Sequence, residues 1–203
     1  MKEDIKNKAT EMFLTLGFKS VTMDDIANEM GISKKTIYAH YQNKTQLVEE
    51  CTFTVFDRIC VGIDTICESA PNPIEELYHI KKFVMEHLKN ESSSPHYQLR
   101  KYYPKLYERL MWKQFEVMHD SVKKNLQKGI DQGLFRSSMD VEFVSRMYFN
   151  GMQGIKDETL FPKPKFQLPI LMENYLEYHL RAIVTFKGME ILRKFITINK
   201  SQN

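Results

Sequence analysis

The side chains best suited to chemistry gather between residues 33 and 45, a stretch that contains no Asp or Glu. The cationic members are Lys34, Lys35 and Lys44. The hydrogen-bonding members between them are Thr36, Tyr38 and His40. Ammonium groups neutralise DNA phosphates, and hydroxyl, ammonium and imidazole groups contact phosphates and the edges of bases. Because the basic side chains are concentrated at one place, the stretch predicts a surface that contacts the DNA duplex.

A short helix is expected to present these groups. Ser33 is a good N-cap residue, and the pattern favours a helix from Lys34 to Tyr41. Ile37 and Tyr41 are four residues apart, so they share one face and pack inward. The outward face is then left to Lys34, Lys35, Thr36, Tyr38 and His40.

Three capping signals place this helix in a small helical cluster. Thr22-x-x-Asp25 is a capping-box pattern that opens a short helix, which Gly31 ends. Asn43-x-x-Gln46 opens a further helix in the same way. An amphipathic helix over residues 5–16 precedes them. Two short helices joined by a tight turn are typical of a helix-turn-helix, whose second helix enters the DNA major groove.

Side-chain chemistry suggests a division of roles. Lys44 lies at a helix start and suits a phosphate, as do the hydroxyls of Thr22 and Tyr38. Lys35, Thr36 and His40 are better suited to base edges. The predicted DNA-binding residues are Thr22, Ser33, Lys34, Lys35, Thr36, Tyr38, His40, Tyr41 and Lys44. For any single lysine the alternative is an ordinary solvated helix face.

Composition limits the class of protein. The chain has 203 residues, a net charge of +3 and 42% hydrophobic residues, as expected for a folded chain. The few Gly and Pro residues disfavour an all-β fold, and the helical patterns predict an all-α fold. The charged N-terminus and the lack of a long apolar run predict a cytoplasmic protein. The three cysteines include no C-x-x-C pair, and we expect no metal and no cofactor.

Helical patterns continue to the end of the chain. The expected helices lie near residues 44–68, 74–90, 105–132, 139–158 and 169–197. Ser138 is the expected N-cap of the fourth of them. This organisation divides the chain into a DNA-binding domain, residues 1–47, and a larger helical domain, residues 48–203. Helix 44–68 would be the only continuous element that joins the two parts, so we expect it to transmit a signal between them.

The last predicted helix carries a heptad seam from Leu171 to Ile196, which indicates shallow packing against another helix. Gly151 and Gly154 in the preceding helix would allow a partner helix to approach closely. The predicted dimer-interface residues are Tyr148, Gly151, Met152, Ile155, Leu171, Tyr175, Tyr178, Ala182 and Met189. An intramolecular bundle is the alternative interpretation of the same seam.

Residues 5–48 resemble the DNA-binding domain of the TetR family of bacterial transcriptional regulators. The resemblance is carried by Phe13, Gly17, Phe18, Thr22-Met-Asp-Asp-Ile-Ala27, Gly31-Ile-Ser-Lys-Lys-Thr-Ile-Tyr-Ala-His-Tyr41, Asn43-Lys44 and Leu47. Tyr41 stands where the family usually has Phe. The resemblance implies an all-α regulator of about nine helices, with an N-terminal three-helix module and a larger ligand-binding and dimerisation domain. It also implies a repressor that binds a palindromic operator as a homodimer and is released by a small organic effector.

Aromatic and sulfur-containing side chains in the larger domain are candidates for the effector pocket. They are Cys60, Phe83, His87, Tyr103, Trp112, Phe115, His119 and Met147. Residues of these types at helical spacing are more often ordinary core, so that alternative stays open for each. Cys60 and Cys67, seven residues apart, also allow an oxidant-sensing thiol pair.

Two other functions are alternatives to an effector-responsive regulator. A helical enzyme that carries a helix-turn-helix would need a catalytic motif, but the sequence contains no phosphate loop, nucleophile elbow or metal signature. We therefore expect no enzymatic activity. A structural DNA-binding protein with a filled core and no effector is the second rival, and binding of small molecules would distinguish it.

Overall fold

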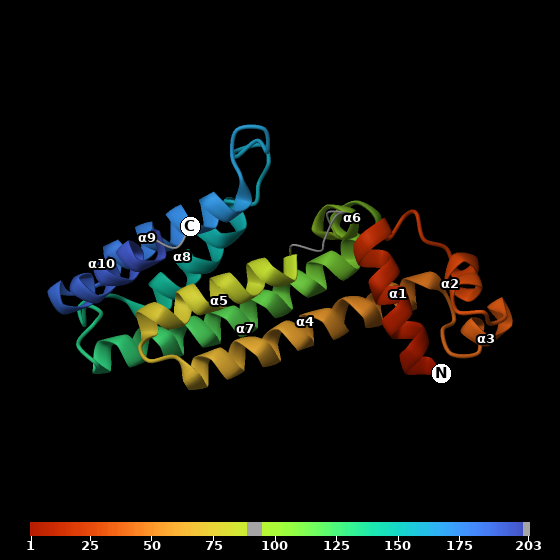
Figure 1. Ribbon diagram of the computed structural model, residues 1–203, viewed down its shortest axis with the longest axis horizontal. Helices are drawn as coiled ribbons and strands as arrows, with labels where there is room; N and C mark the ends of the chain where they lie inside the picture. The colour runs from red at the N-terminus through yellow and green to blue at the C-terminus, as the bar shows by residue number, and fades with distance from the viewer. Residues whose placement is uncertain (89–94, 201–203) are drawn as a thin grey trace. The chain divides into compact units, whose positions relative to one another are not determined.

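The structure is a computed structural model that describes residues 1–88 and 95–200, and these residues form ten α-helices (Figure 1). The helices are α1 (Lys2–Leu16), α2 (Met23–Glu29), α3 (Lys34–Tyr38), α4 (Lys44–Ser69), α5 (Pro73–Leu88), α6 (Pro95–Tyr102), α7 (Pro104–Asp131), α8 (Val141–Gly154), α9 (Leu168–Ile183) and α10 (Phe186–Lys200). The only extended pairing among the described residues is an isolated bridge between Phe135 and Val184. The all-α prediction is confirmed. No described helix is both long and apolar enough to cross a membrane.

The helices group into two compact units. The N-terminal unit consists of residues 1–64 and 84–113, and the C-terminal unit of residues 65–83 and 114–203. Helices α4, α5 and α7 each contribute residues to both units, so α4 is not alone in linking them. The functional boundary expected after residue 47 stays a prediction.

The N-terminal unit is built around one apolar core. Its fully buried members include Ile5 of α1, Ile26 of α2, Ile37 of α3 and Leu47 of α4. Leu99 of α6 belongs to the same core, although the sequence did not predict that helix. Pro95 begins α6, where its fixed φ and missing N–H suit the first turn. The three-helix module is therefore packed together with later parts of the chain.

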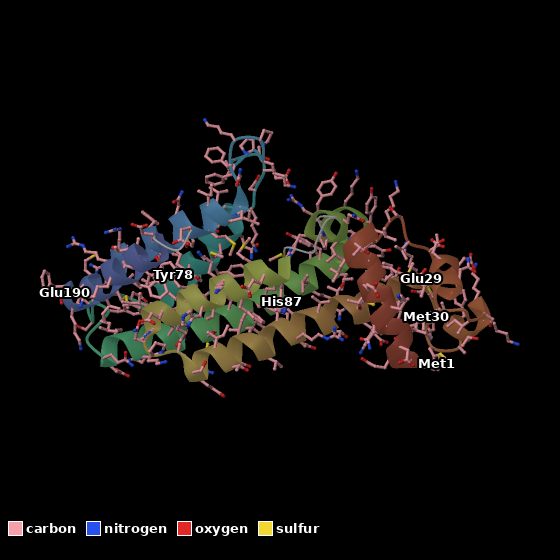
Figure 2. All side chains as sticks on the ribbon, in the orientation of Figure 1. Met1, Glu29, Met30, Tyr78, His87 and Glu190 are labelled. Atoms are coloured by element: carbon pink, nitrogen blue, oxygen red, sulfur yellow. The ribbon has the colours of Figure 1, made fainter. Side chains whose placement is uncertain are left out.

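The C-terminal unit buries a second apolar cluster, which includes Leu126, Leu176, Leu180 and Leu192. The ring of Tyr78 (Figure 2) packs in this cluster with its centroid 4.8 Å from that of Phe195.

A buried polar network joins α5 and α7 in the same unit. The side-chain amide of Asn125 donates to the Pro73 carbonyl at 3.0 Å and to the Glu76 carboxylate at 2.7 Å. Lys128 pairs with the other carboxylate oxygen of Glu76 at 3.1 Å. The buried Glu76 charge is thus compensated within the unit.

The prediction of a single long helix over residues 169–197 is wrong, because α9 ends at Ile183 and α10 begins at Phe186. Between them the Thr185 N–H donates to the Leu134 carbonyl at 2.9 Å, and the Arg136 N–H donates to the Ile183 carbonyl at 2.9 Å. This pairing with a distant loop replaces helical hydrogen bonds, so the heptad seam does not run through one continuous helix.

The predicted N-cap of α8 is also corrected. Helix α8 is capped by Asp140, whose carboxylate accepts from the Phe143 N–H at 3.0 Å, rather than by Ser138.

Candidate functional site

The turn before α3 is held by local hydrogen bonds. Gly31 adopts a φ of +62°, a conformation that favours glycine, and the Ile32 N–H donates back to the Ala27 carbonyl at 3.0 Å. The Ser33 hydroxyl caps α3 by accepting from the Thr36 N–H at 3.1 Å. The predicted cap and turn are therefore confirmed. Helix α3 is shorter than expected and ends at Tyr38.

Two buried side chains, those of Ile37 and Tyr41, hold α3 against the core of the N-terminal unit. The side chains of Ile37 and Tyr41 are both fully buried. The Tyr41 hydroxyl donates to the Lys2 carbonyl at 3.2 Å, and the Lys2 ammonium lies 5.3 Å from the centroid of its ring. The prediction that Tyr41 contacts DNA is therefore wrong, because its ring belongs to the core that supports α3.

The outward face of α3 carries the predicted polar groups. Lys34 and Lys35 are exposed, and Tyr38 retains 44% of its accessible surface. Lys34 forms an ion pair with Asp24 of α2 at 2.7 Å, so its charge is partly compensated. Thr36 and His40 are half-buried beside this face.

Thr22 is occupied by the capping box that the sequence predicted. Its hydroxyl accepts from the Asp25 N–H at 3.1 Å and donates to the Asp25 carboxylate at 2.8 Å. The Thr22 N–H also donates to that carboxylate at 2.8 Å, and these hydrogen bonds lower the pKa of Asp25. The capping role is confirmed, and a phosphate would have to share a hydroxyl that already has two partners.

Lys44 lies at the first position of α4. The side chain of Asn43 caps this helix by accepting from the Gln46 N–H at 2.9 Å, and the Gln46 side chain accepts from the Gln42 N–H at 2.9 Å. Partial burial lowers the pKa of Lys44, an effect that the nearby Asp25 charge opposes. A cation at a helix N-terminus is well suited to a phosphate, whose charge would favour the protonated amine.

Two residues of this region lay outside the sequence predictions. Asp24 could have been noticed as an acidic residue in the first turn of α2, but its pairing with Lys34 depends on the turn. Gln98 of α6 accepts from the Lys19 N–H at 3.1 Å and packs against Gly17, so it supports the turn between α1 and α2. The sequence contains no local signal for that long-range contact.

The predicted pocket residues have different surroundings. In the N-terminal unit, Cys60 is half-buried, and burial raises the pKa of its thiol. Tyr103 packs edge-on against Phe18 with a centroid separation of 6.2 Å. The side chain of Trp112 is 63% exposed, and His87 at the end of α5 is also exposed (Figure 2). The place of Trp112 and His87 in an effector pocket therefore stays a prediction.

The remaining predicted pocket residues belong to the C-terminal unit. Phe115 stacks on His119 at 5.3 Å, and the His119 Nε2 lies 3.1 Å from the Glu142 carboxylate. Phe83 is half-buried. Met147 is 47% exposed, and its predicted place in an effector pocket stays a prediction.

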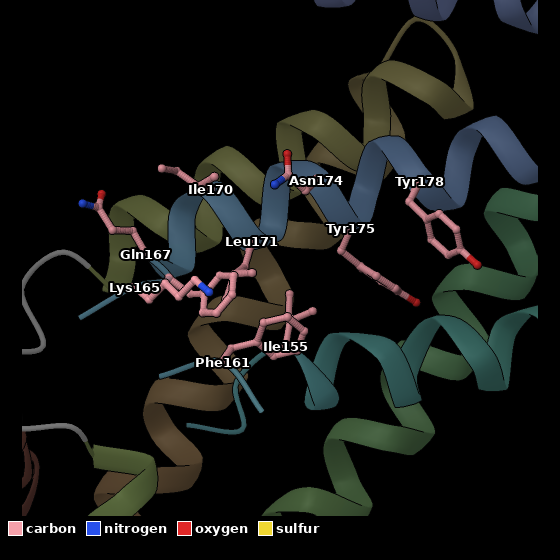
Figure 3. A pocket seen from close by; sticks show the side chains of 10 residues that line it. Ile155, Phe161, Lys165, Gln167, Ile170, Leu171, Asn174, Tyr175 and Tyr178 are labelled. Carbon is pink, nitrogen blue, oxygen red and sulfur yellow. The ribbon is translucent and has the colours of Figure 1, made fainter. Parts of the chain in front are cut away.

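A different group of side chains surrounds a cavity of about 430 Å³ in the C-terminal unit (Figure 3). It is lined by Ile155, Phe161, Lys165, Phe166, Gln167, Ile170, Leu171, Asn174, Tyr175 and Tyr178. These residues come from the connection between α8 and α9 and from α9 itself. None of the predicted pocket residues lines this cavity.

The predicted dimer residues divide between buried and exposed positions. Tyr148, Ile155 and Leu171 are buried within the unit, while Met152, Met189 and Tyr175 are half-buried. The ring of Tyr175 lies against Gly151, so the close approach expected for this glycine is made inside the chain. Tyr178 and Ala182 are exposed.

A second set of apolar residues on the same helices is exposed. Phe143 and Met147 of α8 are 61% and 47% exposed, and Ile170 and Tyr178 of α9 are 55% and 72% exposed. We call these four residues the α8–α9 apolar face. Helices α8 and α9 contact each other, and large exposed apolar side chains on such a helix pair are candidates for an interaction surface.

A supported turn and a short outward-facing cationic helix form a helix-turn-helix, and the comparisons show which known proteins are similar to it. Residues 5–51 match the family described as "Bacterial regulatory proteins, tetR family". Over these residues the chain carries the DNA-binding domain of that family. Its relatives are transcriptional regulators rather than enzymes.

Individual relatives agree with this assignment. The chain is 27% identical over 152 residues to the HTH-type transcriptional repressor KstR2 of Mycolicibacterium smegmatis, covering 71% of this chain and 72% of the relative. A transcriptional regulator from Cytophaga hutchinsonii has the same fold, with a TM-score of 0.77, 18% identity, and coverage of 90% and 98% of the two chains. The complex of SmeT, a Stenotrophomonas maltophilia repressor, with triclosan has a TM-score of 0.65, 16% identity, and coverage of 91% and 92%.

Proposed function

We propose that the protein is a repressor that binds a palindromic operator as a homodimer and is released by a small organic effector. The observation that supports DNA binding most strongly is that one face of α3 is buried and the other is exposed to solvent. Ile37 is fully buried, whereas Lys35 and the hydroxyl-bearing ring of Tyr38 are exposed on the opposite face. A helix anchored on one side and cationic on the other is suited to insertion into the major groove.

Phosphate contacts would position the helix in the groove. Lys44 at the start of α4 and Lys34 on α3 are the proposed phosphate ligands, with Tyr38 as a neutral donor. Lys35, Thr36 and His40 are the proposed base-reading residues. Lys35 in the groove would offset phosphate charge as Lys34 and Lys44 do, so a dimer would neutralise about six phosphate charges.

The homodimer is supported by the α8–α9 apolar face. Leaving Phe143, Ile170 and Tyr178 in water is unfavourable, and a second copy of the same face would bury them about a two-fold axis. Two-fold symmetry in the protein is in turn matched by a palindromic DNA site. Sedimentation should therefore give twice the mass of one chain, and Tyr178→Glu should shift the protein toward the monomer.

Repression and release by an effector are supported by the relatives. KstR2 and SmeT are named as repressors, and SmeT forms a complex with triclosan. An effector bound in the C-terminal unit would favour a different separation of the two α3 helices in the dimer. Couplings of this kind are typically about 1–3 kcal/mol, which corresponds to a 5- to 150-fold loss of operator affinity. Helices α4, α5 and α7 are the candidates for transmitting it, because each contributes to both units.

Selection of binding sites from a random pool of duplex DNA tests the proposal. We expect the selected sequences to converge on an inverted repeat. Lys35→Ala should relax the preference at one base position by about 1–3 kcal/mol. Lys124→Ala, which removes an exposed lysine of α7, is the matched control and should retain the preference. A pool that does not converge would refute the proposed function.

A further inference from the structure

The cavity of the C-terminal unit has predominantly apolar walls, and aromatic rings contribute to them. Four rings line it, and two of them, Phe161 and Phe166, meet edge-to-face with centroids 5.4 Å apart. Tyr175 and Tyr178 supply the other two rings from α9 (Figure 3). A volume of about 430 Å³ lies in the range of sites for small organic molecules, about 300–1,000 Å³. Ring faces of this kind pack well against a flat apolar body.

The charge of the lining is carried by one residue. Lys165 is the single charged side chain among the lining residues, and its ammonium lies 5.5 Å from the Phe166 ring centroid. Within the described part of the chain Lys165 forms no ion pair. The neighbouring Lys163, by contrast, does not line the cavity and is paired with Glu158 at 2.7 Å. The Lys165 ammonium is thus available to an anionic group of a bound molecule.

The polar atoms of the lining further restrict the chemical class of molecule that the cavity can bind. The Tyr175 hydroxyl already donates to the carbonyl oxygens of Met147 and Tyr148, at 3.0 and 3.1 Å. Its ring therefore offers an apolar face rather than a hydrogen bond. Asn174 is exposed at the lining and offers a neutral amide.

We infer that this cavity binds an organic carboxylate with a flat apolar body, its acid group on Lys165 and its rings against Phe166 and Tyr175. Cation and carboxylate would form a charge-assisted hydrogen bond, while burial of the apolar body supplies the hydrophobic part of the affinity. The inference names a chemical class and a place for the effector, and to that extent it rests on the proposed function.

Calorimetric titration of the DNA-free protein with 2-naphthoate and with its uncharged analogue 2-naphthamide tests the site. We expect naphthoate to bind more tightly than naphthamide to the unaltered protein. Lys165→Gln should weaken naphthoate binding about tenfold and leave naphthamide binding nearly unchanged. Lys163→Gln is the matched control, because it removes a lysine two residues away that is outside the lining, and it should change neither affinity.

Phe166→Ala should weaken the binding of both compounds, since it removes a ring that contacts the shared naphthalene body. The inference is overturned if neither compound binds at millimolar concentration, if the two bind equally, or if the two lysine variants behave alike. Titration of the same preparations with operator DNA separates this result from the proposed function. Naphthoate binding without operator binding would refute the function and leave the site, and the reverse result would refute the site alone.

Discussion

The ring of Tyr175 on α9 occupies the space that a side chain at Gly151 on α8 would need. A Cβ built at Gly151 would overlap three atoms of the Tyr175 ring and hydroxyl. The Tyr175 hydroxyl holds the ring there by donating to two carbonyl oxygens of α8. The packing of α8 on α9 therefore depends on a glycine at this position.

Gly151→Ala should destabilise the protein by about 1–3 kcal/mol, because the added methyl group displaces the Tyr175 ring and strains its hydrogen bonds. Chemical denaturation measures the loss. Gly154→Ala is the control, since a Cβ there meets no atom within 4 Å. Equal stability of the two variants would contradict this role of Gly151.

The helix-turn-helix could be predicted from sequence because its signals are local. Each of the caps at Thr22, Ser33 and Asn43 joins residues three positions apart, so spacing alone reveals them. The burial of Ile37 could also be predicted, because Ile37 and Tyr41 are four residues apart and share one helix face. Tyr41 was predicted both to pack inward and to contact DNA, and its hydrogen bond to Lys2, 39 residues earlier, settles the first role.

The break between α9 and α10 could not be predicted from spacing, because Val184 and Thr185 contain no helix-breaking residue. The break arises from hydrogen bonds to the loop at residues 134–136, a tertiary contact. One local signal exists: the Thr185 hydroxyl accepts from the Gly188 N–H at 3.2 Å as an N-cap. The cavity was missed for a similar reason, since its lining depends on how the connection after α8 folds back onto α9.

Two tyrosines near α3 should respond differently to loss of the hydroxyl. Tyr41→Phe should cost about 0.5–1.5 kcal/mol of stability, because it removes the hydrogen bond to Lys2, and it should leave operator affinity unchanged. Tyr38→Phe should leave stability unchanged and weaken operator binding several-fold, since an exposed donor to phosphate is lost. Denaturation and fluorescence anisotropy measure the two effects. The assignment fails if Tyr41→Phe alone impairs DNA binding.

The ion pair between Asp24 and Lys34 should restrain DNA binding. Asp24→Asn releases the Lys34 ammonium and removes a negative charge near the phosphates, so operator affinity should rise about 2- to 5-fold. Glu29→Gln, on the same helix, removes the same charge without touching Lys34 and serves as the control. If both variants raise affinity equally, net charge rather than the ion pair is responsible.

His179 of α9 should make stability depend on pH. Its ring is 7% exposed and packs against Tyr148 at 4.7 Å, and burial lowers the pKa of His179 to about 4 from 6.5. The unfolded chain therefore binds a proton that the folded chain does not bind between pH 6.5 and 4. Stability should be full above pH 6.5 and should fall by about 3 kcal/mol as the pH drops to 4.

His179→Phe keeps a ring beside Tyr148 and cannot be protonated. Denaturation midpoints of this variant should lose most of the dependence on pH between 6.5 and 4. His79→Gln, which alters an exposed histidine of α5, should keep it. An unchanged acid sensitivity of His179→Phe would show that other groups cause it.

The salt dependence of operator affinity tests the DNA-binding surface most directly. With about six neutralised phosphates per dimer, the logarithm of the association constant should fall with the logarithm of salt concentration with a slope of roughly −5. Lys44→Gln removes two of these contacts and should reduce the slope to roughly −3.5, whereas Lys124→Gln should leave it at the original value. A Lys44→Gln slope equal to that of the unaltered protein would contradict the placement of phosphate at the start of α4.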